Sequence, residues 1–243
     1  FDMRLVENFV EVLRHNGVDV YIPPRQRGSG TQAIVHGDLD FVKRVARRNA
    51  PLFADAVRQG YKVVTLDPAS AACFRYEYPT ILDDEDATLL AENTSDACEY
   101  LWSLHQRGKL LLDFHPVNLN VGYHYPCRAA AMTEESAAEQ LLRLIPGLNV
   151  TRLDAECCGM AGTFGLRKRF YRASLRGGRA LMRQLRSPND HLGSSECCAC
   201  KIQMEQGAIQ PTLHPVKLLA LAYGLVPDDV DLLSAPRNRL RVS

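Results

Sequence analysis

The stretch Glu156-Cys157-Cys158-Gly159-Met160-Ala161-Gly162 places two adjacent thiols at the start of a glycine-rich turn. More cysteines lie on either side of it. Cys127 is separated from the pair by 29 residues, and Cys197-Cys198-Ala199-Cys200 follows the pair after 38 residues. Grouped thiolates are soft ligands that select iron–sulfur clusters, zinc or copper(I) over harder cations. The spacing therefore predicts a soft-metal site.

Four thiolates complete a tetrahedral zinc site or a cubane iron–sulfur cluster. This pattern offers five, and two adjacent cysteines strain to reach one small ion together, so a larger or irregular cluster uses them more naturally. Cys198 could be a spare or a substitute ligand, and the sequence does not decide between the two. Cys73 and Cys98 are predicted to be buried apolar thiols. The candidate ligands are Cys127, Cys157, Cys158, Cys197 and Cys200.

The bulk composition is that of an ordinary globular protein. The chain has 243 residues, a net charge of +1, 46% hydrophobic and 23% charged residues. No apolar run of about 18 residues predicts a membrane span, and no secretory signal is visible. Cysteines in a non-secreted chain of this size favour metal or redox chemistry over a disulfide framework. The first residue is Phe1, from which we expect a processed chain or a fragment of a longer polypeptide.

Periodicity predicts strands separated by helices, which is typical of an α/β fold with mostly parallel, short sheets. Helices are expected over 5–15, 38–49, 51–60, 134–144, 166–185, 201–206 and 215–223, with a further pair within 84–106. Strands are expected over 18–22, 61–66, 118–123 and 149–153. From Pro227 the pattern predicts a loosely packed tail.

The two halves of the chain match in spacing, which indicates an internal duplication. Forty residues separate Ser29 from Ser70, compared with 38 between Cys158 and Cys197. In the first half the thiols are replaced by Gly28, Ser29 and Ser70, and only Cys73 remains. Serine and glycine are poor ligands for soft metals, so the first repeat should bind no cluster. The predicted domains are residues 1–112, a repeat that has lost its ligands, residues 113–226, the cysteine-bearing repeat, and the tail 227–243.

A basic run follows the paired cysteines. No acidic residue and eight basic ones lie between Cys157 and Asn189. A solvated helix face is one interpretation, and a docking surface for an acidic electron-transfer partner or flavin domain is another. Nucleic-acid binding is disfavoured by the near-zero net charge and the lack of interleaved aromatic residues. His124 and His214 lie near the cysteines, where they could bond the backbone or serve the cluster.

The cysteine segments resemble the CCG, or cysteine-rich, domain family. The resemblance is carried by Tyr123-His124-Tyr125-Pro126-Cys127, Cys157-Cys158-Gly159-Met160-Ala161-Gly162, Cys197 to Gly207 and His214 to Leu219. The family includes subunits of heterodisulfide reductase, anaerobic glycerol-3-phosphate dehydrogenase and glycolate oxidase. Its members carry two copies of the domain, which would cover nearly the whole chain as two pseudo-repeated α/β units. The degenerate first copy looks most like the C-terminal part of fused FAD-linked oxidoreductases.

The resemblance implies a non-cubane [4Fe-4S] cluster held by the five cysteines that match the motif. It implies electron transfer from FAD toward a quinone or another carrier, within a 2-hydroxyacid or glycerol-3-phosphate dehydrogenase type of enzyme. The sequence contains no flavin-binding segment and no ferredoxin-type run, so FAD, the substrate site and a further iron–sulfur domain would belong to a missing domain or partner. The implied location is the cytoplasm, peripheral at the inner face of the membrane. The alternatives are a zinc-holding structural module and thiol–disulfide chemistry at the cluster.

Overall fold

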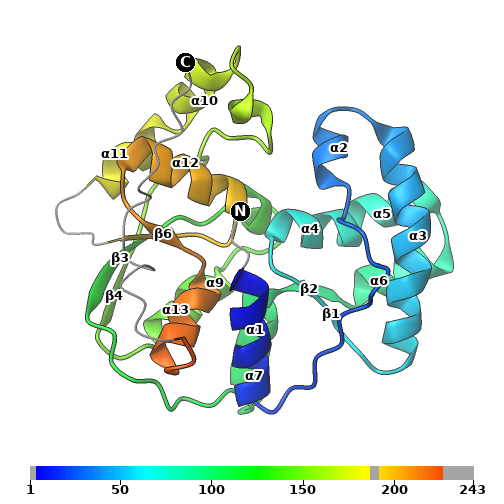
Figure 1. Cartoon of the computed structure of the whole chain (residues 1–243), viewed down its shortest axis with the longest axis horizontal. Helices are drawn as coiled ribbons and strands as arrows, with labels where there is room; N and C mark the ends of the chain where they lie inside the picture. Colours follow the sequence, from blue (N-terminus) through cyan, green and yellow to red (C-terminus); the bar gives the residue numbers. More distant parts are fainter. Residues whose placement is uncertain (1–3, 187–191, 227–243) are drawn as a thin grey trace.

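The computed structural model describes residues 4–186 and 192–226. It is an α/β structure with two parallel sheets, one in each half of the chain (Figure 1). The fold class predicted from the sequence is thus confirmed as α/β. The predicted tail from residue 227 lies outside the described residues, and the domain boundaries stay a prediction.

The first half is mostly helical around a sheet of two parallel strands, in which Val63 pairs with Thr94. Its strands are β1 (Val63–Thr65) and β2 (Thr94–Asp96). Its helices are α1 (Arg4–His15), α2 (Thr31–Val35), α3 (Leu39–Arg58), α4 (Pro68–Ala72), the π-helix η1 (Cys73–Glu77), α5 (Tyr78–Leu82), α6 (Glu85–Glu92) and α7 (Ala97–Gln106).

The second half contains a four-stranded parallel sheet in the order β4-β3-β5-β6. Its strands are β3 (Leu119–Tyr123), β4 (Leu148–Arg152), β5 (Leu192–Ser194) and β6 (Thr212–Leu213). Its helices are α8 (Cys127–Ala130), α9 (Ala137–Arg143), the 3-10 turn η2 (Phe164–Leu166), α10 (Tyr171–Gly177), α11 (Arg179–Leu185), α12 (Cys198–Ala208) and α13 (Pro215–Ala222).

The order of this sheet creates a topological switch point. The chain passes from β3 to β4 on one side and then returns to place β5 on the other side of β3. Connections leave adjacent strands β3 and β5 in opposite directions, and open parallel sheets form a crevice at the carboxyl ends of strands arranged in this way. Ligands of open parallel sheets bind in such crevices, and the cysteine segments begin there.

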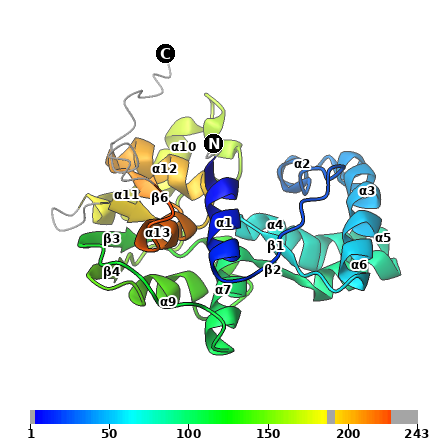
Figure 2. The same cartoon turned by 60° about the horizontal axis from the view of Figure 1, so that its bottom comes forward.

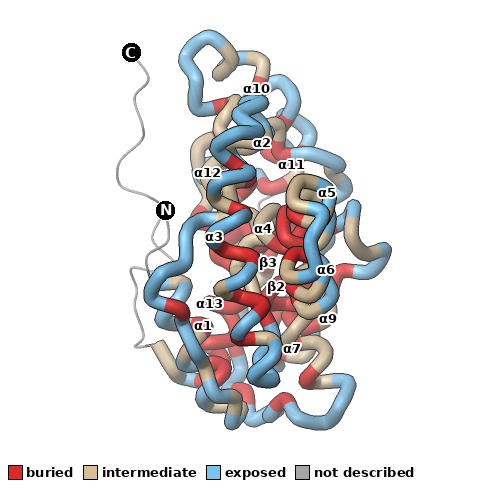
Figure 3. Tube along the Cα trace, turned by 90° about the vertical axis from the view of Figure 1, so that its right-hand side faces the viewer, coloured by how far each residue is buried: buried red, intermediate tan, exposed pale blue. Residues whose placement is uncertain are grey.

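The largest hydrophobic core joins the two halves. Helices α1 and α7 lie between the two sheets (Figures 1 and 2), and their apolar residues Phe9, Val12 and Leu101 belong to the same buried cluster as Val121 and Leu141 of the second half. Buried stretches concentrate toward the middle of the molecule, with exposed ones toward its ends (Figure 3). Helices of the first half therefore pack into one core with the second half.

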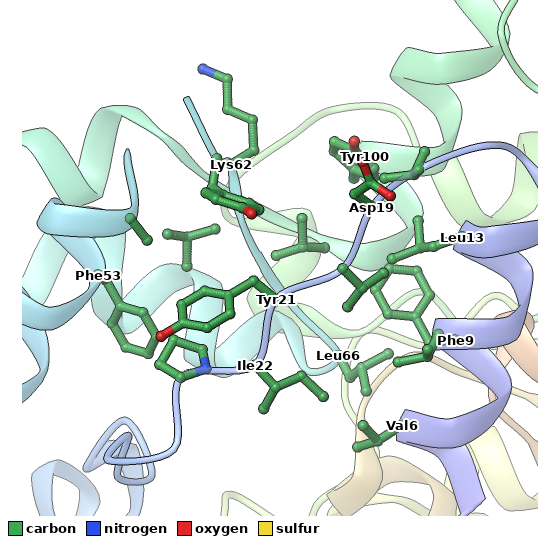
Figure 4. Close-up of a pocket in the computed structure, with 18 of the residues that line it drawn as sticks. Val6, Phe9, Leu13, Asp19, Tyr21, Ile22, Phe53, Lys62, Leu66 and Tyr100 are labelled. Carbon is green, nitrogen blue, oxygen red and sulfur yellow. The ribbon is translucent and has the colours of Figure 1, made fainter. Parts of the chain in front are cut away.

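Three predicted elements are wrong. Residues 18–22 form no strand; the segment runs beside β1 without a ladder, and its side chains line a cavity of about 460 Å³ with Phe9, Phe53 and Leu66 (Figure 4). Pro51 does not begin a helix, because α3 continues through it.

The long helix predicted over 166–185 is the third error, since it is divided into η2, α10 and α11. The break falls at Gly178, where the helix must pass the backbone of the cysteine turn. A Cβ atom added at Gly178 would lie 2.1 Å from the carbonyl oxygen of Cys158. The close approach requires glycine at this joint. The helical periodicity of the sequence does not reveal this requirement, because it comes from a contact with a distant segment.

A candidate cluster site at the switch point

The loops after three neighbouring strands deliver the candidate ligands to one place. Cys127 opens α8 just after β3, and Cys157 and Cys158 follow β4. Cys197 is the N-cap residue of α12, directly after β5, and Cys200 lies in the first turn of that helix. Because the strands are parallel, their carboxyl ends share one edge of the sheet. All five predicted thiols are thus brought to the same crevice.

The five thiols form a continuous chain of contacts. Cys127 and Cys158 both hydrogen-bond Cys157, and the Sγ atoms of Cys158 and Cys200 are 3.0 Å apart. Cys197 completes the chain through a hydrogen bond to Cys200. No three or more His, Cys, Asp or Glu side chains in the described ranges converge on one metal-ion position. This extended arrangement suits a multi-atom cluster better than a single tetrahedral ion.

The electrostatics of the chain of thiols favour one thiolate, at Cys157. Hydrogen bonds from Cys127 and Cys158 and from the backbone N–H of Gly159, 3.2 Å from Sγ, lower the pKa of Cys157 far below the usual thiol value. The same contact to Cys157, together with burial, raises the pKa of Cys127. A deprotonated sulfur is the form that binds metal. Cys157 therefore begins with the charge that a cluster ligand needs.

The turn that carries the paired cysteines is held by a backbone contact that leaves no room for a side chain. Gly159 has a positive φ of +83°, and a Cβ atom there would lie 2.2 Å from the carbonyl oxygen of Ser174 and 2.5 Å from the amide nitrogen of Gly178. The turn is thereby pressed against the joint between α10 and α11. This contact fixes where Cys157 and Cys158 point.

Buried polar groups without partners surround the crevice. Both ring nitrogens of His124 and the hydroxyl oxygens of Ser194 and Ser195 are buried and have no hydrogen-bond partner among the described residues. His124 directly follows β3. Ser194 is the last residue of β5, and Ser195 follows it. Orphaned buried donors carry a cost of about 1–3 kcal/mol each. An anionic cluster with sulfur acceptors fits such an edge.

Next to the ligands lies a buried carboxyl group. The Tyr123 hydroxyl donates to Glu196 Oε1 at 2.8 Å and lies 2.6 Å from the Ser136 hydroxyl. Burial raises the pKa of Glu196 to about 8, so the carboxyl holds a proton at neutral pH. A neutral carboxyl beside Cys197 adds no repulsion to a group of thiolates.

The remaining residues singled out by the sequence lie elsewhere. Cys198 is exposed and its backbone N–H donates to Asp67 Oδ2 at 3.3 Å. His214 bonds the backbone with both ring nitrogens, accepting from Val216 N and contacting the Leu66 carbonyl at 3.0 Å. Cys98 is buried in the joint core, as predicted. Sequence reasoning missed Ser194 and Ser195, although they immediately precede the Glu196-Cys197 segment.

In the first half, hydroxyl groups stand at two of the positions that the sequence matches to cysteines of the second half. The Ser29 and Ser70 hydroxyl oxygens are 3.0 Å apart, so the two positions predicted to match Cys158 and Cys197 do meet in space. Cys73 is buried and donates from Sγ to the carbonyl oxygen of Ser29 at 3.5 Å. Burial raises the pKa of the Cys73 thiol to about 12. A single protonated thiol among hydroxyls is a poor soft-metal site.

Comparison with known proteins bears on the second half most directly. Residues 121–205 match the cysteine-rich domain family, CCG, which confirms the predicted resemblance for this part. The chain is 33% identical over 222 residues to one of the subunits of anaerobic glycerol-3-phosphate dehydrogenase from Escherichia coli (strain K12), covering 90% of this chain and 55% of that protein.

Two weaker similarities extend the range of relatives. One of the subunits of the fumarate reductase (CoM/CoB) from Methanothermobacter marburgensis is 24% identical over 86% of this chain and 40% of that protein. D-2-hydroxyglutarate dehydrogenase of Escherichia coli (strain K12) is 25% identical over 68% of this chain and 16% of that protein. The chain thus spans about half the length, or less, of these relatives. In the part of the chain that the structure describes, no helix is long and apolar enough to cross a membrane.

Proposed function

We propose that this chain, whose residues 121–205 match the cysteine-rich domain family, is the iron–sulfur electron-transfer region of a flavin-dependent oxidoreductase. The observation that carries the proposal is the convergence of five thiols at the switch point of the second sheet. Cys127, Cys157, Cys158, Cys197 and Cys200 would hold one cluster of the [4Fe-4S] type, with a non-cubane form suited to five ligands. When bound, the cluster supplies a one-electron carrier.

The residues around the thiols would serve the cluster in separate ways. The backbone N–H of Gly159 donates to Cys157 Sγ and would stabilise negative charge on that sulfur. His124, buried with both ring nitrogens unbonded, could donate to sulfur from its neutral ring, because burial lowers its pKa to about 4. Hydrogen bonds of this kind raise the reduction potential of a cluster.

The proposed electron donor is a flavin-binding domain or subunit, with a further iron–sulfur domain and a quinone or other carrier beyond it. Similarity to proteins of a glycerol-3-phosphate dehydrogenase and a 2-hydroxyglutarate dehydrogenase supports this class of parent enzyme. We place the assembly in the cytoplasm, peripheral at the inner face of the membrane. The chain would relay electrons, and substrate oxidation would occur outside it.

A basic surface beside the cysteine turn supports docking of an acidic partner. It consists of the exposed residues Arg167, Lys168, Arg169, Arg172, Arg176, Arg179, Arg183 and Arg186. Its helices α10 and α11 contact the turn at Gly159, so a partner bound there would come close to the thiols. Charge complementarity of this kind accelerates association and weakens with added salt.

The test is reduction of the anaerobically purified or reconstituted full chain. Broad visible absorption from an iron–sulfur centre should bleach when a reduced flavin is added and return when a quinone analogue is added. Stoichiometric zinc without acid-labile sulfide would contradict the proposal and favour a structural zinc module. A cluster whose spectrum responds to added thiols would instead favour disulfide chemistry.

A further inference from the structure

The first half contains a cavity at the place where the duplicated cysteines have been replaced. Its volume is about 740 Å³, and it is lined by residues 27–33 (a loop and the start of α2), by helix α3 and by the start of α4, together with Cys198 of the second half. Its polar lining combines three arginines with three hydroxyls: Arg27, Arg44, Arg48, Ser29, Thr31 and Ser70. None of these residues is a candidate cluster ligand.

The arginines bring uncompensated positive charge to this cavity. Arg27, Arg44 and Arg48 are exposed, and none of them forms an ion pair within residues 4–186 and 192–226. One acidic residue, Asp67, belongs to the lining. Its Oδ1 accepts from Ala69 N at 2.8 Å and its Oδ2 from Cys198 N at 3.3 Å, so its oxygens already serve the backbone.

The hydroxyls form a chain that can direct a hydrogen into the cavity. Ser29 Oγ is 2.8 Å from Thr31 Oγ1 and 3.0 Å from Ser70 Oγ, and Thr31 donates to the carbonyl oxygen of Ala69 at 3.3 Å. Either oxygen can be the donor in the two hydroxyl pairs. Because Thr31 donates to Ala69, all three contacts are satisfied when Ser29 donates to Thr31 and Ser70 donates to Ser29. A ligand oxygen would then take the place of Ser29 as the acceptor of the Ser70 hydrogen.

Buried side chains hold the segment around Arg27 and Ser29 in place through hydrogen bonds to its backbone. The fully buried Asn49 accepts from Arg27 N and donates to the carbonyl oxygen of Arg27, both at 3.0 Å. Tyr78 donates from its hydroxyl to the carbonyl oxygen of Ser29 at 3.0 Å. A pocket held in this way is largely preformed, which lowers the entropic cost of binding.

From this geometry we infer that the cavity of the first half is a binding site for a small oxyanion, a carboxylate or phosphate group. Guanidinium forks and hydroxyls match the oxygens of either group and offer nothing to a soft metal. Phe41 and Val45 supply an apolar wall for the rest of such a molecule. The inference rests on this cavity and does not depend on the cluster proposal.

The test is titration of the full chain with inorganic phosphate and, separately, malonate, at constant ionic strength, followed by calorimetry. We expect saturable binding at one site, and the tighter probe identifies the group as phosphate or carboxylate. R44Q and R48Q should each weaken binding by about tenfold or more, the effect of losing one charge-assisted hydrogen bond.

Arg47 supplies the matched control, because it is exposed on the same helix and does not line the cavity. R47Q should change the affinity by less than about twofold, as expected for a screened surface charge. Absence of saturable binding of both probes would overturn the inference. So would an equal loss in R47Q and R48Q, since binding would then depend on net charge alone.

Discussion

Gly159 and Gly30 have the same backbone conformation, but their surroundings leave different amounts of room for a side chain. Both have left-handed backbones, with φ of +83° and +87°. A Cβ atom at Gly30 would meet Val42 at ordinary contact distances of 3.6–3.7 Å, whereas one at Gly159 would collide with the backbone of Ser174 and Gly178. The turn with the paired cysteines is therefore the one that tolerates no side chain.

Substituting each glycine by alanine separates the two effects. We expect G30A to lower the free energy of unfolding by about 1–2 kcal/mol, the cost of a left-handed alanine. G159A should lose about 1–3 kcal/mol more, because α10 and α11 must move away from the turn. Denaturant unfolding of the two variants in parallel measures the difference. Equal losses would show that the close approach at Gly159 contributes nothing.

Asp96 should make the stability of the protein depend on pH. It is 6% exposed and caps α7 by accepting from the backbone N–H groups of Cys98 and Glu99. Burial and the charge of Glu99 raise its pKa to about 6, against an ordinary value of 3.8. A raised pKa means that the folded state binds the proton more tightly than the unfolded state does.

The sign of the effect follows from that difference. The contribution of Asp96 to stability is fully present below about pH 4 and is lost as the pH rises through about 6, with a total of about 2–3 kcal/mol. D96N, which keeps a capping oxygen, should flatten this part of the stability–pH curve. D84N, at the exposed N-cap of α6, is the control. If D96N keeps the slope of the wild type, the assignment to Asp96 is wrong.

At the scale of elements, the sequence was most informative where local pattern and capping agree. Asp38 caps α3 by accepting from Phe41 N at 3.0 Å. Val121 sits at the centre of β3, a strand that the sequence predicts over 118–123. Elements set by long-range contacts were missed. Strand β5 contains Leu192-Gly193-Ser194, and a Cβ atom at Gly193 would lie 2.8 Å from both Met204 Cε and Thr212 Oγ1. Only this tertiary packing explains why a glycine occupies position 193.

The ligand side chains could be proposed from the sequence because cysteine spacing is a strong signal, whereas their surroundings could not. The orphaned hydroxyls of Ser194 and Ser195 and the buried proton on Glu196 depend on burial, which no motif records. The error at residues 18–22 has the same origin. Val18 and Val20 pack against the joint core, which explains their apolar, strand-like pattern. Within the described residues, the backbone amides of residues 19–22 nevertheless form no hydrogen bond to the neighbouring strand β1.

Hydrogen exchange should distinguish that segment from a true strand. The amides of residues 19–22 donate to no backbone carbonyl within the described chain, whereas β3 is paired with β4 and β5 on its two sides. We expect residues 19–22 to exchange near the rate of an open loop and residues 119–123 to be protected by global unfolding. Comparable protection of the two segments would mean that 18–22 joins the first sheet.

At the scale of the whole molecule, the two halves share one core but differ in the chemistry of their matching sites. Sulfur lines the crevice of the second half, and hydroxyls with arginines line the corresponding cavity of the first. The contacts Asp67–Cys198 and Leu66–His214 connect the two halves of the chain. We therefore propose one cluster per chain, in the same molecule as the proposed oxyanion site.

The iron and acid-labile sulfide content of the anaerobically prepared chain tests this assignment most directly. The wild type should hold about four iron and about four sulfide ions per chain. Serine substitution of Cys157, Cys158 or Cys200 should abolish or sharply reduce both, while C198S and C73S should keep them. An iron content near twice this value would contradict a single cluster held by the second repeat. So would a loss of iron in C73S to the same extent as in C158S.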